Sequence, residues 1–187
     1  MAQKRKDWNG LISGFKASDL VFLDESECNT DMTRRYAYSL GGSRAVDSTP
    51  LSKPKNTTIL SSIQLDGTLR YTTFSGGTTV ERFKRYLETD LLPHLNGNSI
   101  LIMDNMKSHH AKAVKNLLDS SEIRYIYLPP YSPDLNPIEK LWSKVKSFLR
   151  KFKARTLDAL PNAIQNAFHS VTISDCSGWF RFCGYAL

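Results

Sequence analysis

Three acidic residues stand where carboxylates can do chemistry together. Asp24 and Asp104 each follow a short apolar run, and Glu139 lies in the first turn of an expected helix. Three carboxylates that converge in a partly dry site repel one another. Hard divalent cations relieve that repulsion, and their preference for oxygen ligands points to Mg²⁺ or Mn²⁺. Two such ions roughly 4 Å apart can stabilise the attacking and leaving oxygens of a phosphodiester, so in-line phosphoryl transfer is the expected chemistry.

Strands and helices that alternate along the chain must position these acids. Strands are expected over residues 20–23, 34–40, 56–64, 68–74, 99–103 and 123–128, from short runs rich in apolar, β-branched and aromatic residues. The dipeptide Asp66-Gly67 lies between two of these runs and predicts a hairpin. The helical spacing of apolar residues predicts helices over about 79–92, 109–119, 137–152 and 157–171.

This order of elements predicts an α/β fold, a mixed sheet flanked by helices on both faces. Ligands of such sheets gather outside the carboxyl ends of the parallel strands, where Asp24 and Asp104 are both expected. The segment 129–133 contains three prolines and can bring the helix that begins near Glu139 back over the same edge. We expect a polar lead-in over residues 1–18, one domain over 19–172 and a C-terminal tail over 173–187.

The composition excludes several classes of protein. The chain has 187 residues, of which 41% are hydrophobic, enough for one domain with a real core. Its three cysteines form no Cys-x-x-Cys pair, so neither a disulfide scaffold nor a structural zinc site is indicated. No apolar run approaches the roughly 18 residues of a membrane span, and no signal peptide is evident. A cytoplasmic protein is expected, and its net charge of +7 fits an anionic partner such as nucleic acid.

The acids also have ordinary structural explanations. Asp24 and Asp104 can simply end strands, as acids often do at turns. Asn136, Pro137 and Glu139 fit the first positions of a capped helix, where the glutamate would accept hydrogen bonds from backbone N–H groups. A catalytic and a capping role for Glu139 can coexist, because a helix start holds its side chain in a fixed direction.

Neighbouring polar residues are further candidates. His109 and His110 can ligate a metal, although histidines at a helix start more often bond to the backbone. Asn105 and Asn136 are expected to orient the substrate or the carboxylates. Cys28 is near Asp24 in sequence and is interpreted as a loop residue.

The flanks of the three acids resemble the motifs of a known family. The first acidic motif of the DDE transposases resembles the segment Val21–Ser26, and the second resembles Leu101–Asn105 with its two following histidines. The third motif of the mariner superfamily is highly specific and resembles Leu128–Trp142, which contains Pro129-Pro130-Tyr131-Ser132-Pro133-Asp134 and Asn136-Pro137-Ile138-Glu139. The 34 residues between Asp104 and Glu139 (105–138) have the length typical of its bacterial insertion-sequence branch.

The resemblance covers about residues 15–170 and implies a ribonuclease H-like fold with a five-stranded mixed sheet. It implies that Asp24, Asp104 and Glu139 are catalytic and hold two Mg²⁺ ions, for which Mn²⁺ can substitute. The implied enzyme is a transposase, an endonuclease that excises an element at its ends and joins it to target DNA, commonly at TA. Such transposases usually act as homodimers on paired DNA ends.

Two segments depart from the family pattern. The segment Arg35-Tyr36-Ala37-Tyr38, with Gly41 or Gly42 after it, resembles the family's Arg-Tyr-Gly-Trp segment with Gly and Trp replaced. Met106 follows Asp104-Asn105 where the second motif usually has alanine. Neither departure changes a carboxylate.

The expected helix after Glu139 carries an unbalanced positive charge. Residues 140–155 include seven basic residues and no acid. Ser143, Lys146, Arg150 and Lys153 follow Glu139 at steps of three or four and form one face. We expect DNA phosphates to be bound by Lys140, Lys144, Lys146, Arg150 and Lys153. A solvated charged face is the ordinary alternative.

Full-length relatives carry an N-terminal helix-turn-helix region, for which the 18 residues before the first strand are too few. We expect an upstream frame to supply that module, in a prokaryotic host where the protein associates with the nucleoid. Two other interpretations stay open: a non-catalytic DNA-binding remnant or regulator, and another ribonuclease H-like nuclease.

Overall fold

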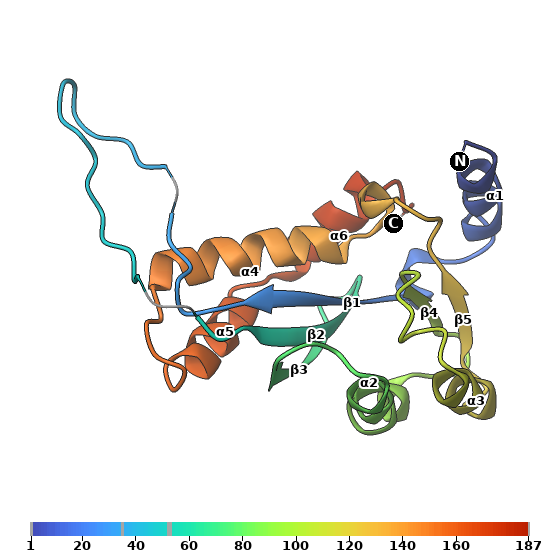
Figure 1. Cartoon of the computed structure of the whole chain (residues 1–187). Coiled ribbons are helices and arrows are strands. Elements are labelled where there is room, and N and C mark those ends of the chain that lie inside the picture. Colours follow the sequence, from blue (N-terminus) through green and yellow to red (C-terminus); the bar gives the residue numbers. More distant parts are fainter. Residues whose placement is uncertain (1, 35, 52–53, 187) are drawn as a thin grey trace.

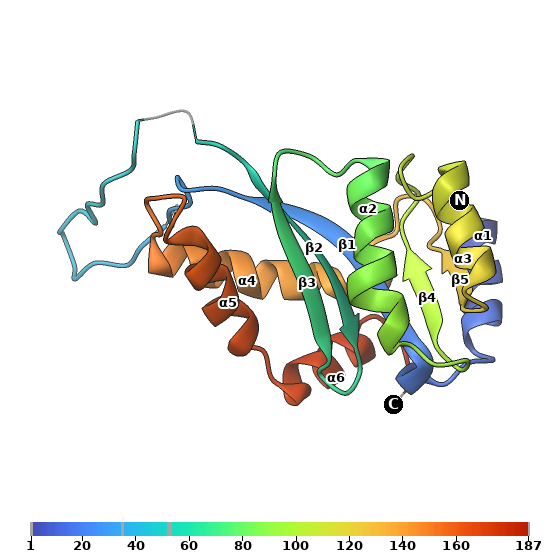
Figure 2. The same cartoon turned by 90° about the horizontal axis from the view of Figure 1, so that it is seen from below.

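The computed structural model describes residues 2–34, 36–51 and 54–186 and contains a five-stranded mixed sheet (Figures 1 and 2). Its strands are β1 (Leu20–Cys28), β2 (Thr57–Gln64), β3 (Leu69–Ser75), β4 (Ile100–Met103) and β5 (Arg124–Tyr127). They lie in the order β3-β2-β1-β4-β5. The central strand β1 is antiparallel to β2 and parallel to β4. The predicted mixed α/β sheet is therefore confirmed, including the hairpin, in which Gly67 adopts a φ of 89° that favours glycine.

Helices cover both faces of the sheet. They are α1 (Ala2–Ile12), α2 (Val80–Tyr86), α3 (Lys112–Ser120), α4 (Ile138–Phe152), α5 (Leu160–His169) and α6 (Ile173–Phe182). Short turns of 3₁₀ or π helix are η1 (Ala17–Asp19), η2 (Leu87–Leu91), η3 (Leu92–His94) and η4 (Pro133–Leu135). The buried residues of α4, α5 and α6 belong to one core and those of α2 and α3 to another, and Figure 1 shows α4 and α6 on the opposite side of β1 from α2 and α3. In the described part of the chain, no helix has the length and apolarity to span a bilayer.

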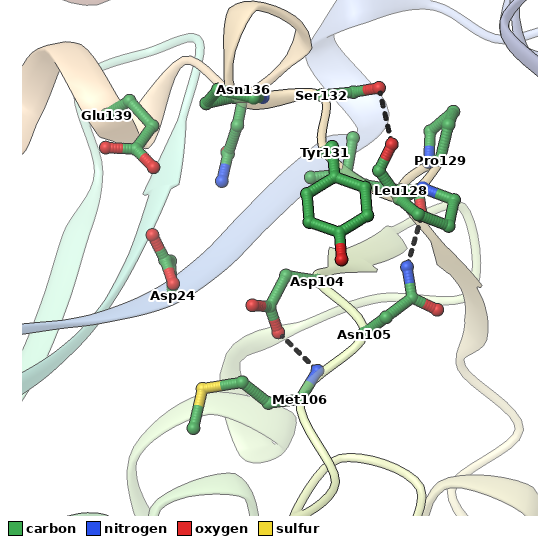
Figure 3. A pocket seen from close by; sticks show the side chains of 12 residues that line it. Asp24, Asp104, Asn105, Met106, Leu128, Pro129, Tyr131, Ser132, Asn136 and Glu139 are labelled. Carbon is green, nitrogen blue, oxygen red and sulfur yellow. Dashed lines mark hydrogen bonds between the residues drawn. The ribbon is translucent and has the colours of Figure 1, made fainter. Parts of the chain in front are cut away.

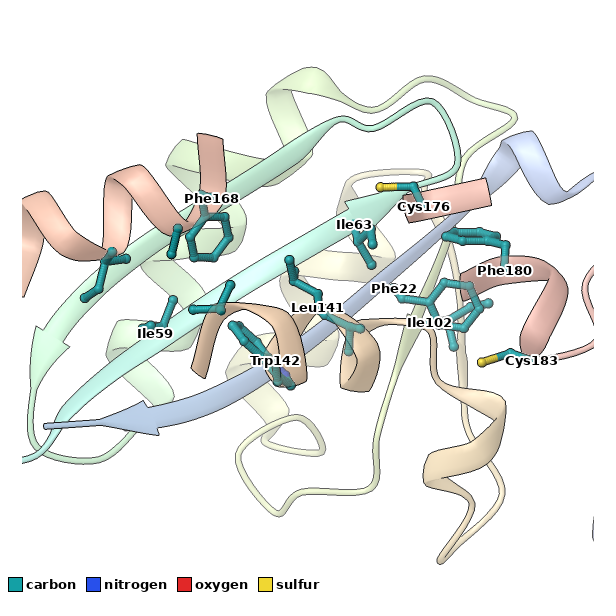
Figure 4. Close-up of a cluster of buried hydrophobic side chains, with 14 of the residues drawn as sticks. Phe22, Ile59, Ile63, Ile102, Leu141, Trp142, Phe168, Cys176, Phe180 and Cys183 are labelled. Atoms are coloured by element: carbon teal, nitrogen blue, oxygen red, sulfur yellow. The ribbon is translucent and has the colours of Figure 1, made fainter. Parts of the chain in front are cut away.

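The alternation of side chains along β1 divides the interior into two cores. Leu20 and Phe22 point to the core beneath α4, α5 and α6, which Figure 4 shows from close by. Val21 and Leu23 point to the second core, beneath α2 and α3. A strand buried on both faces explains why the sequence shows a continuous apolar run here.

The arm between β1 and β2 differs from the sequence prediction. No strand forms over the described residues of 34–40, and Figure 1 shows the segment extending away from the sheet. Tyr36 and Tyr38 are 90% and 107% exposed, so their aromatic character reflects no packing within this chain. Arg35 lies outside the described residues. Cys28, interpreted from the sequence as a loop residue, is instead the buried last residue of β1, because β1 continues along β2 beyond its apolar run.

Both ends of the chain contribute to the first core. The sequence predicts no element before residue 19, yet α1 forms there and its Trp8 is 4% exposed. In the segment 173–187, α6 brings the fully buried Phe180 against Phe22, with ring centroids 5.4 Å apart.

Candidate active site

The parallel pairing of β1 with β4 places two acids side by side. The last residue pair of this ladder is Leu23 with Met103, so Asp24 and Asp104 are the next residue on each strand. Asp104 follows the end of β4, as predicted. Asp24 lies inside β1, which continues to Cys28 against β2, so the prediction that it ends its strand is wrong. The two acids still lie at the predicted edge of the sheet, because β4 ends at Met103, the residue that pairs with Leu23.

The loop from β5 to α4 brings Glu139 to the same edge. Asn105 fastens this loop, since its Nδ2 donates to the carbonyl of Leu128 at 2.6 Å. Tyr185 fastens it further on by donating to the carbonyl of Leu135 at 2.6 Å. The helix α4 then begins at Ile138 with no side-chain cap, so the capping explanation of Glu139 is not realised. Its carboxylate is exposed and has no hydrogen-bond partner among the described residues.

The three acids line one open cavity of about 430 Å³ (Figure 3). Its wall is formed by the ends of the parallel strands and by the proline-rich loop. The lining residues are Asp24, Asp104, Asn105, Met106, Leu128, Pro129, Pro130, Tyr131, Ser132, Pro133, Asn136 and Glu139. All three acids predicted from the sequence, and both asparagines, are therefore gathered at one place.

Asp24 is held at the cavity wall by two donors. Its Oδ1 accepts the backbone N–H of Glu25 at 2.8 Å, and its Oδ2 accepts the indole N–H of Trp142 at 3.1 Å. Burial is the main reason that the pKa of Asp24 rises to about 7, and the negative charges of Glu25 and Asp104 add to the effect. A buried carboxylate that prefers its proton is a group that a cation would stabilise in the ionised form.

Asp104 is held from the other side by a histidine. Its Oδ1 accepts the backbone N–H of Met106 at 2.9 Å and lies 2.8 Å from Nδ1 of His109. Burial raises the pKa of Asp104, but the hydrogen bonds from these two donors and the charges of His109 and His110 outweigh burial and lower it. Among the described residues its Oδ2 has no partner, and Figure 3 shows one carboxylate oxygen of Asp104 directed toward Asp24.

His109 and Glu25 are the residues that the sequence analysis missed in this role. The imidazole Nε2 of His109 lies 3.1 Å from Oε1 of Glu25, and His109 is fully buried. Burial lowers the pKa of His109, but its bonds to the side chains of Asp104 and Glu25 outweigh burial and raise it to about 10. The sequence does contain a signal for Glu25. Side chains alternate between the two faces of a strand, so the neighbour of Asp24 must point to the opposite, buried face.

The remaining polar candidates differ in their surroundings. Asn136 is 4% exposed, and its Oδ1 is a buried acceptor without a hydrogen-bond partner in the described part of the chain. Figure 3 shows its amide nitrogen directed into the space between Glu139 and Asp24. The ring of His110 lies tilted against that of Tyr127 instead, with ring centroids 4.2 Å apart.

The donor set fits hard divalent cations. Three carboxylates line the cavity, and two of them have at least one oxygen without a protein partner among the described residues. As they stand, no three His, Cys, Asp or Glu side chains in the described ranges form a group that could hold a metal ion. The three acids therefore suit such cations in their ligand chemistry and in lining one cavity.

Some of the basic residues along α4 and at its C-terminal end are already engaged with partners in the chain. Lys144 pairs with Asp175 at 2.5 Å, and Lys153 pairs with Asp47 at 2.5 Å. The ammonium group of Lys140 lies 3.8 Å from the ring centroid of Phe182. Lys146 and Arg150 have no ion-pair partner among the described residues, so they are the members of the expected strip that are open to phosphate.

Comparison with known proteins places these features in a family. A family model described as DDE superfamily endonuclease matches residues 19–161. The Tc1 transposase of Caenorhabditis elegans is 27% identical over 97 residues, which are 50% of this chain and 36% of that protein. The Tcb2 transposase of Caenorhabditis briggsae is 30% identical over 71 residues, 38% of this chain and 26% of that protein. The chain thus spans about a third or less of the curated relatives that it matches.

The fold is also that of a solved transposase. The pre-cleavage Mos1 transpososome matches with a TM-score of 0.81 at 18% identity, over 97% of this chain and 58% of the Mos1 chain. A structure of the Mos1 transposase catalytic domain and raltegravir with Mg matches with a TM-score of 0.71 at 17% identity. That match covers 95% of this chain and 86% of the other. The ribonuclease H-like fold expected from the motifs is confirmed.

Proposed function

Since this chain belongs to the DDE superfamily endonucleases, we propose that it is the catalytic domain of a Tc1/mariner-type transposase. It cleaves phosphodiester bonds at the ends of a DNA element and joins the ends to target DNA. The observation that carries this proposal is the pairing of Leu23 with Met103, which sets Asp24 beside Asp104 on the wall of a cavity shared with Glu139. The proposed catalytic domain runs from residue 19 to 172, and α1 and α6 pack against it from either end of the chain.

In this proposal the three carboxylates hold Mg²⁺, or Mn²⁺ in its place. Asp24 and Asp104 lie on adjacent strands, and the exposed carboxylate of Glu139 completes the set. Two bound ions would polarise the phosphodiester and lower the pKa of the attacking hydroxyl. The chain itself positions the acids. The hydrogen bond from Trp142 fixes Asp24, and the hydrogen bond from Asn105 fixes the loop that leads to Glu139. The Mos1 catalytic domain with Mg supports this choice of ion.

The proposed partner is DNA, bound as transposon ends and as target. Similar Mos1 structures include a pre-cleavage transpososome and a paired-end complex with the left transposon end, which supports the proposal. Lys146 and Arg150 contact backbone phosphates, because both are free of ion pairs and follow Glu139 along α4. Lys140, Lys144 and Lys153 belong to the same proposed surface but must first leave their present partners.

The active complex is proposed to be a homodimer. The arm between β1 and β2 supports a second copy, since it extends from the sheet and exposes Tyr36, Tyr38 and Leu51. A helix-turn-helix module, the product of an upstream frame outside these 187 residues, would recognise the terminal repeats. The Mos1 and Tc1 chains are longer than the part matched here, which is consistent with such a module.

We further propose that the chain belongs to the bacterial insertion-sequence branch and acts in a prokaryotic host, where it associates with the nucleoid. These proposals rest on the 34 residues between Asp104 and Glu139 (105–138) alone. The curated relatives are nematode transposases and do not support that branch.

An end-cleavage assay tests the function. The chain and its upstream partner are combined with Mg²⁺ and DNA that carries the inverted repeats flanking the coding frame. Asp104→Asn is compared with Asp158→Asn, a matched change at an exposed acid that does not line the cavity. We expect metal-dependent cleavage and joining by the wild type and by Asp158→Asn, and neither by Asp104→Asn.

The same assay separates the two alternatives. DNA binding without nicking, equal in the wild type and in Asp104→Asn, would indicate a non-catalytic DNA-binding remnant. Nicking of branched DNA without end joining would indicate a different ribonuclease H-like nuclease. Either result would contradict the proposal.

A further inference from the structure

A buried histidine links one acid of the cavity to the opposite face of the sheet. His109 is fully buried and lies between two carboxylates, with Nδ1 2.8 Å from Oδ1 of Asp104 and Nε2 3.1 Å from Oε1 of Glu25. A carboxylate oxygen accepts hydrogen bonds, so each ring nitrogen acts as a donor. The residue therefore connects the loop after β4 with β1 through its side chain alone.

Asp24 and Glu25 are neighbours on β1, and their side chains point to opposite faces of the sheet. Asp24 bonds to Trp142 of α4, whereas Glu25 points to the layer that contains α2 and α3. The side chain of Glu25 is 8% exposed, and its Oε2 is buried with no hydrogen-bond partner in the described part of the chain. His109 is thus the one side chain among the described residues that hydrogen-bonds the Glu25 carboxylate. A buried carboxylate held this way is a fixed anchor for the ring.

The ring itself has little freedom to turn. It stacks on Phe83 with centroids 4.2 Å apart and an interplanar angle of 27°. The backbone carbonyl of His109 accepts the hydroxyl of Tyr127 at 3.0 Å, and its N–H donates to the carbonyl of Met106 at 3.0 Å. Rotation of the imidazole would break the stacking and both carboxylate contacts. The position of Nδ1 is therefore set by α2, β1 and β5 together.

A fixed Nδ1 determines which oxygen of Asp104 is available. Oδ1 is occupied by His109 and by the N–H of Met106. Oδ2 has no partner among the described residues, and Figure 3 shows an oxygen of Asp104 facing Asp24 across the cavity. We propose that His109, anchored by Glu25, is a positioning residue that holds the Asp104 carboxylate with one oxygen free for a divalent cation. This role rests on the proposed function, because it assumes that Asp104 binds the ion.

Direct binding of Mn²⁺ to the DNA-free chain tests the role without turnover. Titration calorimetry compares the wild type, His109→Ala and the matched control His110→Ala, whose ring lies tilted against Tyr127 and has no hydrogen bond or ion pair with an acid of the cavity among the described residues. Loss of an outer ligand partner commonly weakens metal binding by about 10- to 100-fold, and we expect that loss in His109→Ala only. Asp104→Asn is included to show that the measured ion occupies this site.

Two further variants keep the test decisive if His109→Ala does not fold. In His109→Asn the amide can reach the Asp104 side of the ring position, and in His109→Gln it can reach the Glu25 side. We expect Asn to bind Mn²⁺ about 10-fold more tightly than Gln, because only Asn restores a donor to Oδ1. A residue needed merely for packing would give no such order. The ring-nitrogen NMR signals of the metal-free wild type should also shift in Glu25→Gln.

The possible failures are distinguishable. If the wild type binds no Mn²⁺, or binds it as tightly as Asp104→Asn does, the proposed function fails and this role fails with it. If the wild type binds Mn²⁺ at Asp104 but His109→Ala binds it equally well, only the role of His109 is overturned. Equal affinities of the Asn and Gln variants would overturn it in the same way.

Discussion

The indole N–H of Trp142 donates to Oδ2 of Asp24 at 3.1 Å, across 118 positions of the chain. Trp142 lies on α4, one turn after Glu139, while Asp24 lies on the central strand. The helix that carries one acid of the cavity therefore also holds another acid in place. Relative movement of α4 and β1 would displace both at once.

Trp142→Phe should separate this bond from packing. The phenyl ring fills much of the same space beneath α4, but it donates no hydrogen bond to Asp24. We expect about a 10-fold slower end cleavage and a loss of only about 1–2 kcal/mol in the free energy of unfolding. Trp179→Phe, a partly buried tryptophan of α6, serves as the control. Equal cleavage rates in both variants would show that the indole bond does not matter.

The pKa of Asp24 predicts a pH-dependent stability in the absence of metal. The folded chain keeps the Asp24 proton up to about pH 7, whereas the unfolded chain releases it near pH 3.8. The folded state binds more protons between these values, so its free energy of unfolding falls as pH rises from about 4 to about 7. Asp24→Asn removes this contribution and should be up to about 4 kcal/mol more stable than the wild type at pH 8, because one pKa unit corresponds to about 1.4 kcal/mol.

Urea denaturation at several pH values measures the difference between the two chains. The difference should grow from pH 4 to pH 7 and then stay constant. Added Mg²⁺ should stabilise the wild type more than Asp24→Asn, because the ion offsets the buried charge. A difference that is independent of pH would contradict this account of Asp24.

The salt dependence of DNA binding should identify the free basic residues. Each phosphate contact with duplex DNA contributes about 0.9 to the slope of log affinity against log salt. The double variant Lys146→Ala with Arg150→Ala should therefore lower the slope by about 2. Lys144→Ala with Lys153→Ala should lower it less, because their ammonium groups are paired with Asp175 and Asp47. The reverse order would mean that the ion pairs open on DNA and that another face is used.

The helix α6 should be part of the folding unit. Phe180 is fully buried and packs against Phe22, so Phe180→Ala should lower the free energy of unfolding by about 3–5 kcal/mol. Phe182→Ala is the matched control, since Phe182 is 67% exposed and should cost less than about 1 kcal/mol. Equal losses in urea denaturation would contradict the placement of α6.

Local sequence signals predicted most of the sheet. Apolar runs mark β1 and β4 because both strands are buried on both faces, and Asp66-Gly67 marks the hairpin because glycine tolerates the positive φ of its turn. The segment around Tyr36 has the composition of a strand but no neighbour to pair with, so composition alone misleads there.

The missed helix α6 did carry a signal. Thr172 and Asp175 form a reciprocal capping box at its start, with Thr172 accepting the N–H of Asp175 and the Asp175 carboxylate accepting the N–H of Thr172. A threonine followed three residues later by an acid is the sequence pattern of such a start. The helix α1 offers no comparable pattern, since it is predominantly polar and buries mainly Trp8.

The candidate site shows where sequence reasoning stops. Asp24, Asp104 and Glu139 could be named because each stands in a local motif, and the structure lines one cavity with all three. The contact of His109 with Glu25 spans 84 positions and depends on how α2, β1 and the loop after β4 pack together. Lys144 and Lys153 are likewise engaged in ion pairs with Asp175 and Asp47, which are distant in sequence, so local patterns do not reveal that these lysines are occupied.

Anomalous scattering from crystals soaked in Mn²⁺ locates the bound ion directly. We expect Mn²⁺ in the cavity, ligated by Asp24 and Asp104 with Glu139 completing the set, and no such signal in Asp104→Asn. Mn²⁺ bound only elsewhere on the chain, or bound identically in the wild type and in Asp104→Asn, would contradict the claim that these three acids form a metal-dependent catalytic site.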